Sequence, residues 1–187
     1  MKKQNLIVGL ALAVAIGGII SFQSCTRIGK LLNFNLGMQT ESVNVTIPAT
    51  AANGLITIGP ATTYFNVDSF VKAQTGNQLG ASNITSVKLA SVVFTLNNAT
   101  PFNNFQNFES CSAAFTSNTN STPYTVSIPS NPDVFANTLV LPVDSTTELK
   151  SYIGNQLNYT VSGKLRRPTT DSLNCTVTFK FSVAVQG

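Results

Sequence analysis

The sequence predicts an all-β fold: a single antiparallel β-sandwich of Greek-key or immunoglobulin-like type, with about eight or nine strands and one or two short helices. From residue 173 to 185, apolar residues occupy every second position, which is typical of a strand with one face in water. Further strand-like segments follow at short spacing, separated by clusters of Asn, Gly, Pro and Ser. Parallel sheets need long crossover helices, and the helical patterns here are short. A closed barrel is the alternative architecture.

The first predicted strand covers residues 34–47, and its apolar positions change phase between Met38 and Val43. A phase change inside a strand indicates a bulge or a crossing between sheets. The segment 83–96 has a similar slip at Val92 and Val93. The remaining predicted strands are 54–58, 62–67, 105–115, 123–128, 137–143, 157–165 and 173–185.

Two short helices fit between these strands. One begins near Asp68 and ends before Gly76. The other has Ser145 and Glu148 at capping-box spacing and Leu149, Tyr152 and Ile153 on one face.

The N-terminus predicts export. Lys2 and Lys3 precede an uncharged apolar run from residue 6 to 22, and Ser24-Cys25 follows. The run is short for a bilayer span of about 20 residues, so it fits a secretory signal better than an uncleaved anchor helix, which is the alternative.

Residues 20–25, Ile-Ser-Phe-Gln-Ser-Cys, resemble the loose lipobox of Bacteroidota-type bacterial lipoproteins, with Phe22 where Leu is common. The resemblance implies a signal peptide over residues 1–24, a short membrane tether over 25–33 and the sandwich over 34–187. It also implies a lipid-modified Cys25, carrying a diacylglyceryl thioether and an acyl chain such as palmitate, and therefore membrane lipid as a partner.

The same resemblance predicts a location. Surface export in such lipoproteins is associated with an acidic cluster after the cysteine, whereas this chain has Arg27 and Lys30 there. We therefore expect a lipid-anchored outer-membrane protein that faces the periplasm rather than the cell surface.

Composition excludes several functions. The chain has no histidine and only seven acidic residues, which are scattered, so His-based triads, His-ligated zinc and carboxylate metal sites are poorly supplied. The basic residues form no stripe with interleaved aromatics, so we expect no nucleic-acid binding. We predict a protein that is not an enzyme and uses neither metal nor cofactor.

The tract 101–108 is rich in Phe and Asn. Exposed, Phe102, Phe105 and Phe108 would offer a ligand-binding surface for a glycan or a protein; the alternative is that they fill the core. Cys111 and Cys175 both fall on apolar phases. They either form a disulfide, as an oxidising compartment allows, or stay buried as free thiols.

Two tripeptides, 144–146 and 171–173, resemble the acceptor for O-glycosylation in Bacteroidota periplasmic proteins, with Ser145 and Ser172 as the acceptors. The run from Lys164 to Arg167 is either a phosphate-binding or acidic-glycan-binding loop or a solvated one.

Two functions compete. The first is a non-catalytic accessory or structural subunit of a cell-envelope assembly, which contacts an envelope protein through strands or loops. The alternative is a glycan-binding module of the envelope. A strand-exchanging, pilin-like subunit is a third hypothesis.

Overall fold

The computed structural model describes residues 33–64 and 66–187. The signal peptide, Cys25 and almost all of the tether that the sequence predicts lie outside these residues. The elements are β1 (Asn33–Ile47), β2 (Leu55–Thr63), α2 (Val67–Gln74), η2 (Ala81–Asn83), β3 (Ile84–Leu96), η3 (Phe105–Asn107), β4 (Phe108–Ser117), β5 (Tyr124–Ile128), β6 (Thr138–Leu141), η4 (Lys150–Tyr152), β7 (Leu157–Leu165) and β8 (Leu173–Gln186).

The strands form two four-stranded antiparallel sheets, in the orders β1-β8-β3-β6 and β2-β7-β4-β5. Apart from the β4–β5 hairpin, each connection between consecutive strands crosses to the other sheet. The predicted antiparallel sandwich is confirmed. Within the Greek-key class, this strand order is that of an eight-stranded jelly roll and differs from the immunoglobulin order.

The core lies between the sheets and follows the period-two pattern of the sequence. Along β8 every second side chain from Leu173 to Val185 is buried. β8 is central in its sheet because it pairs with β1 on one side and β3 on the other. With 14 residues, β8 runs along the length of the sandwich and holds β1 and β3 together.

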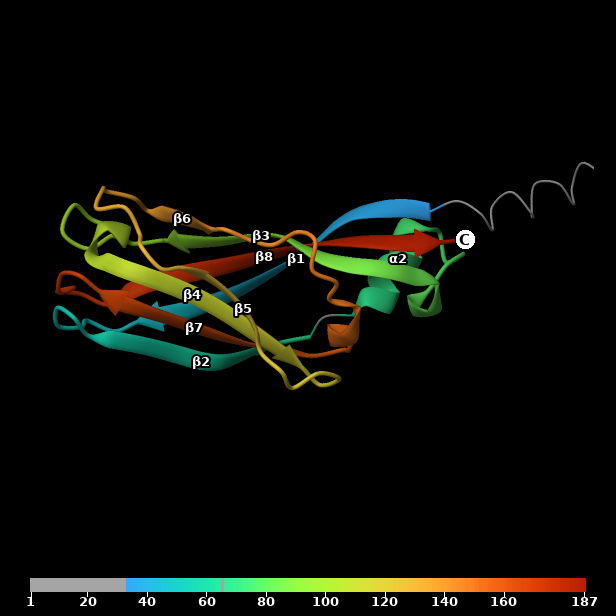
Figure 1. Ribbon diagram of the computed structural model, residues 1–187, viewed down its shortest axis with the longest axis horizontal. Helices are drawn as coiled ribbons and strands as arrows, with labels where there is room; N and C mark the ends of the chain where they lie inside the picture. Colours follow the sequence, from blue (N-terminus) through green and yellow to red (C-terminus); the bar gives the residue numbers. More distant parts are fainter. Residues whose placement is uncertain (1–32, 65) are drawn as a thin grey trace, which may run out of the picture.

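The long axis of the sandwich separates two ends (Figure 1). We call one the four-loop end; it contains the β1–β2, β3–β4, β5–β6 and β7–β8 connections, residues 48–54, 97–107, 129–137 and 166–172. We call the other the α2 end; it contains α2, the start of β1 and the C-terminus. No helix among the described residues has the length and apolar character needed to cross a membrane.

Several predicted boundaries need correction. Segments 54–58 and 62–67 form one strand, β2, whose pairing shifts between Ile58 and Ala61, and Val67 instead begins α2. Pro60 lies within this shift. An edge strand tolerates proline there because the backbone on its unpaired side needs no N–H donor. β3 has two register shifts with β8, between Ile84 and Ser86 and between Leu89 and Ser91, and not at Val92 and Val93 as predicted.

The predicted helix at residues 145–153 is wrong. Only the 3₁₀ turn Lys150–Tyr152 forms. Asp144, and not Ser145, accepts a hydrogen bond from the Thr146 amide, at 2.8 Å. Glu148 accepts from the Val87 amide of β3 at 2.8 Å and from the Lys150 amide at 2.9 Å. The Glu148 carboxylate, which was predicted to close a capping box, thus binds a distant strand between its two register shifts with β8.

Candidate functional site

Buried asparagines fix the four-loop end. Asn104 is fully buried and lies just before η3. Its side-chain oxygen accepts from the Gln106 amide at 2.9 Å and from the Ala136 amide at 3.4 Å. Its side-chain amide donates to the carbonyls of Thr100 and Pro101, at 3.0 and 3.2 Å. One side chain therefore holds the β3–β4 loop in shape and ties it to the β5–β6 loop.

Two further asparagines extend these links. Asn107 donates to the carbonyls of Phe102 at 3.0 Å and Pro168 at 2.8 Å, which joins the β3–β4 loop to the β7–β8 loop. Asn131, in the β5–β6 loop, donates to the carbonyls of Phe105 at 2.7 Å and Phe108 at 3.1 Å. In these loops, side-chain amides therefore take the place of neighbouring strands as hydrogen-bond donors to backbone carbonyls.

The β1–β2 and β7–β8 loops join the same unit. Thr169 donates its backbone amide to the Thr50 carbonyl at 2.9 Å, and its hydroxyl accepts from the Thr50 amide at 3.0 Å. Asn103 accepts from the Thr170 amide at 2.8 Å and donates to the Asp171 carboxylate at 2.9 Å. All four loops are therefore connected by short hydrogen bonds.

The basic run predicted as a loop is engaged within the protein. Arg166 donates to the Asn131 carbonyl at 2.8 Å. Arg167 forms a two-pronged ion pair with Asp133, at 2.7 and 2.6 Å, and Lys164 pairs with Glu109 at 2.8 Å. The hydrogen bond from Arg167 is the main cause that holds the pKa of Asp133 below its usual value.

Apolar side chains project from these fixed loops into solvent. Phe102 is 81% exposed, Val134 61% and Phe135 58%. Asn104 connects both stretches, because it binds the carbonyl of Pro101, next to Phe102, and the amide of Ala136, next to Phe135. Large apolar side chains held outward on a rigid support are suited to binding another molecule.

The structure separates the three predicted phenylalanines. Phe105 and Phe108 are buried, and their ring centroids lie 5.8 Å apart. Phe105 also lies 6.3 Å from the ring of Phe94. Two of the three therefore fill the core, as the alternative interpretation held, and Phe102 alone is accessible.

The two cysteines are buried free thiols on different sheets, Cys111 on β4 and Cys175 on β8. Of the two alternatives that the sequence left open, the structure has free thiols and no disulfide between Cys111 and Cys175. Burial raises the pKa of both thiols to about 12, with the proximity of Cys175 as a second cause for Cys111. Neither thiol is a nucleophile in this state.

The two predicted glycosylation acceptors are exposed. Ser145 lies in the turn that follows Asp144, and Ser172 immediately precedes β8 at the four-loop end. Both are therefore accessible to a modifying enzyme. Among the described residues, no group of three or more His, Cys, Asp or Glu could hold a metal ion.

Sequence reasoning missed a row of hydroxyls on the outer face of the β2-β7-β4-β5 sheet. Thr57, Ser162, Ser112 and Ser127 pair across all four strands and line a shallow basin of about 300 Å³. The signal was present as polar residues at alternate positions, but only the strand order brings them into one row.

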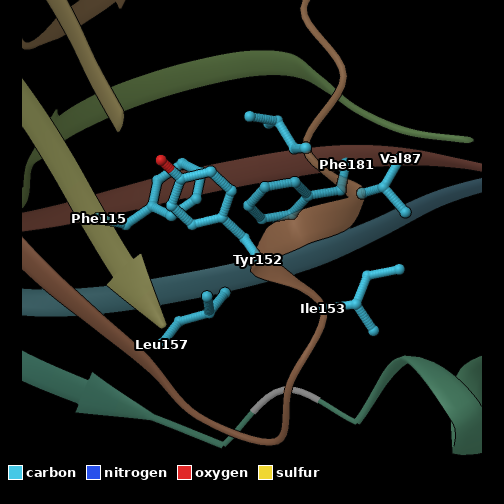
Figure 2. A pocket seen from close by; sticks show the side chains of 7 residues that line it. Val87, Phe115, Tyr152, Ile153, Leu157 and Phe181 are labelled. Atoms are coloured by element: carbon cyan, nitrogen blue, oxygen red, sulfur yellow. The ribbon is translucent and has the colours of Figure 1, made fainter. Parts of the chain in front are cut away.

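Toward the α2 end, a small apolar pocket lies between the sheets. Figure 2 shows Phe115, Tyr152 and Phe181 around it. The other lining residues are Val87, Leu149, Ile153 and Leu157. Its volume is about 10 Å³, which at most admits one water molecule and no ligand.

No known protein family matches the sequence, and no curated protein does. Among solved structures, a protein from Eubacterium rectale described as secreted is 15% identical, with a TM-score of 0.40 over 80% of this chain and 40% of that one. The Cocksfoot mottle virus structure is 11% identical, with a TM-score of 0.33 over 83% of this chain and 84% of that one. The decameric BFDV capsid protein is 9% identical, with a TM-score of 0.39 over 83% of this chain and all of that one.

Proposed function

We propose that the protein is a membrane-anchored lipoprotein whose non-catalytic sandwich acts as an accessory or structural subunit of an outer-membrane or cell-envelope assembly. The observation that carries the proposal is the four-loop end. Four loops cross-linked by buried asparagines present Phe102, Val134 and Phe135 to solvent. Binding surfaces are commonly loops that a rigid scaffold positions, and aromatic side chains dominate their affinity.

The position of the anchor supports an orientation in which the α2 end faces the bilayer and the four-loop end points away from it. Seven residues, 26–32, separate Cys25 from the start of β1, and even a fully extended connection spans less than about 30 Å. β1 itself has 15 residues and is about 50 Å long. Because β1 begins at the α2 end, a lipid on Cys25 holds that end at the bilayer and directs the four-loop end away from it. Arg27 and Lys30, in place of an acidic cluster, support the periplasmic side.

The anchor has a direct test. The intact mass of the protein extracted from its native membrane should match residues 25–187 plus the lipid. A mass that matches the uncleaved chain would contradict the lipoprotein assignment. Further steps of hexose size would indicate glycosylation at Ser145 or Ser172.

The partner surface is tested by replacing its aromatic residues. In the anchored protein, Phe102→Ser with Phe135→Ser should reduce recovery of the partner after mild crosslinking at least tenfold, since truncated hot-spot residues cost about 2 kcal/mol or more. Unfolding should be unchanged because both side chains are exposed. The matched control is Tyr64→Ser, which is 82% exposed but follows the last residue of β2, away from the four loops. Equal loss in the control would contradict the assignment.

The second candidate, an envelope glycan-binding module, is favoured by the hydroxyl-lined basin on the outer face of the β2-β7-β4-β5 sheet. It predicts that the purified chain binds an envelope polysaccharide without any protein partner. Ser112→Val should abolish that binding, whereas the Phe102 and Phe135 variants should retain it. The two functions therefore depend on different faces of the sandwich.

A further inference from the structure

We infer that the outer face of the β1-β8-β3-β6 sheet binds phospholipid phosphates of the bilayer through Lys88 and Lys180. This face of the sandwich, and not the outer face of the other sheet, therefore lies toward the membrane. The inference deepens the proposed role of an anchored lipoprotein and rests on that anchor. It comes from a comparison of the charges that the two sheets carry.

Lys88 and Lys180 are neighbours on the outer face of the first sheet. Each lies between two buried residues of its strand, so both side chains point outward, and both are partly exposed. Lys88 of β3 pairs with Ser182 of β8, and Lys180 of β8 pairs with Ser91 of β3. The two lysines are therefore diagonal neighbours across the strands, at a separation of about 8 Å between Cβ atoms that long side chains can bridge.

No carboxylate balances these two ammonium groups. The ion pairs among the described residues involve other cations, namely Lys72, Lys164, Arg166 and Arg167. Glu41 is the only acidic residue in the four strands of this sheet, and it lies on the inner phase of β1, opposite the buried Phe179. No acidic residue precedes Glu41 in the sequence. The outer face of this sheet thus carries two like charges side by side.

A carboxylate does lie at the edge of β3, but it binds backbone groups. Glu148 accepts from the amides of Val87 and Lys150, at 2.8 and 2.9 Å, and forms no ion pair among the described residues. Neighbouring like charges on a sheet are unfavourable. An anion from outside the chain that binds both ammonium groups would remove this cost.

The other sheet has balanced charges. Its four strands contain one cation, Lys164, and one carboxylate, Glu109. These two side chains pair with each other at 2.8 Å. The two sheets therefore differ in what they offer to an anionic surface, because only the β1-β8-β3-β6 sheet has cations that are not already paired.

Hydroxyl groups beside the two lysines make phosphate a suitable anion. Thr40 of β1 and Ser91 of β3 both lie opposite Lys180, one on each side of β8. We call Lys88, Lys180, Thr40 and Ser91 the lysine patch. Phosphate oxygens accept hydrogen bonds from ammonium and hydroxyl groups, and bonds to a charged donor are the stronger ones.

The position of the lysine patch favours the bilayer as the source of phosphate. Lys88 lies four residues after Ile84, the first residue of β3 at the α2 end, which is a distance of about 13 Å along the strand. A connection of less than about 30 Å from Cys25 to β1 keeps lipid phosphates within reach of the patch at all times. Such a tether gives them a high effective concentration, whereas an acidic protein or glycan has to be recruited from solution. The hydroxyl-lined basin on the opposite face then stays accessible.

The test compares the reactivity of individual lysines on vesicles. The mature chain, residues 25–187, is joined through the Cys25 thiol to a maleimide lipid; Cys111 and Cys175 are buried and should not react. It is placed on vesicles of phosphatidylcholine alone or mixed equally with phosphatidylglycerol. Mass spectrometry then gives the rate at which a water-soluble succinimidyl ester acetylates each lysine. On the anionic vesicles Lys88 and Lys180 should react at least threefold more slowly, since one lysine at an anionic surface gains about fivefold in binding. Lys164 should not change.

A matched pair of variants makes the result specific to one face. Ser91→Glu places a carboxylate within the lysine patch and should abolish the difference between the two kinds of vesicle. Ala114→Glu is the control on the outer face of the other sheet. It lies at the same level of the sandwich, because the ring of its neighbour Phe115 packs against Phe179 and Phe181, on either side of Lys180. Ala114→Glu should leave the difference unchanged, and high salt should remove it in both proteins that show it.

Each other outcome overturns the inference. Equal rates on both vesicles, or equal slowing of Lys164, would show that this face has no preference for lipid phosphate. Slowing on phosphatidylcholine alone that grows with protein concentration would assign the patch to another protein surface. Because the lipid is attached chemically, the measurement does not depend on natural lipidation of Cys25, which the intact mass tests separately. It also requires neither Phe102 nor Phe135, so its failure leaves the accessory role to be judged by the four-loop variants.

Discussion

The four-loop end and the half of the sandwich toward α2 are stabilised by different kinds of interaction. Around Phe115, ring centroids of five aromatic residues lie within 5.3 to 6.2 Å: Tyr124, Tyr152, Tyr159, Phe179 and Phe181. Around Asn104, the contacts are directed hydrogen bonds to backbone groups. Packing fills space between regular strands, whereas amide bonds fix loops without regular structure. Loops fixed in this way can leave apolar residues outside, where they are free to bind.

The strongest test of this comparison removes the central ring. Phe115→Ala should lower the free energy of unfolding by about 3–5 kcal/mol, because it deletes a buried aromatic that contacts five others. Chemical denaturation measures the loss. Phe102→Ala is the control and should stay within about 0.5 kcal/mol, since its ring is exposed. If Phe115→Ala lowered the free energy of unfolding by less than about 1 kcal/mol, the cluster would have repacked, and aromatic packing would not be what stabilises this half of the sandwich.

The second test breaks the amide network. Asn104→Ala removes the side-chain hydrogen bonds to backbone groups of Thr100, Pro101 and Ala136, at about 0.5–1.5 kcal/mol for each bond. Asn104→Asp keeps the acceptor but places a buried carboxylate against the carbonyls of Thr100 and Pro101, so it should destabilise the protein more than Asn104→Ala. Hydrogen exchange should increase at 97–107 and 129–137 and leave β8 unchanged. Uniform destabilisation without a local increase would contradict the role of Asn104 as a link between loops.

These two regions also differ in how far the sequence predicts them. The aromatic half follows from alternation: Phe115, Phe179 and Phe181 all lie on apolar phases of predicted strands, and all three are buried. The sandwich itself was therefore predictable. Local patterns were less reliable where a distant strand decides the outcome, as at Glu148, whose bond to Val87 spans 61 residues and replaces the predicted helix.

The asparagine links were not predictable in the same way. The sequence drew attention to the tract 101–108, but both interpretations concerned its phenylalanines, whereas Asn103, Asn104 and Asn107 are all buried and form the links. Asn104 and Asn107 have capping-box spacing around η3, which was a local signal for part of the network. The partners Ala136 and Pro168 lie 32 and 61 residues away, and no local pattern identifies them.

A third test concerns a charge-dependent contact that Glu148 makes in the half of the sandwich toward α2. Partial burial raises the pKa of Glu148, but hydrogen bonds from Ser86, Val87, Lys150 and Leu149 outweigh it, so the net pKa is lowered. A lowered pKa stabilises the fold above the carboxyl's ordinary value of 4.5 and loses this contribution as the pH falls through the folded-state value. Glu148→Gln should cost at most about 1 kcal/mol at neutral pH, because the side chain is largely exposed to solvent.

The pH dependence provides the check for Glu148. The difference in unfolding free energy between the natural protein and Glu148→Gln should shrink as the pH falls below the ordinary carboxyl pKa of 4.5 and through the lower pKa of the folded state. Asp144 should not obscure this result, because its pKa is lowered to about 2, mainly by the hydroxyls of Thr146 and Thr147. A difference that grows in acid would mean that folding raises, rather than lowers, the pKa of Glu148.

The smallest expected effect on stability is at the ion pair of the four-loop end. It tests whether charges or buried amides hold this end together. Asp133 and Arg167 meet at 2.6 Å, but both side chains are more than two-fifths exposed. Exposed pairs contribute little and are screened by salt, so Asp133→Asn should shift the unfolding midpoint slightly at low ionic strength and not at all in high salt. Arg166 keeps its bond to the Asn131 carbonyl in this variant, so the loop contacts through Asn131 should persist. If Asp133→Asn instead opened the loops as much as Asn104→Ala, charge rather than buried amides would hold this end, and a binding surface there would vary with salt.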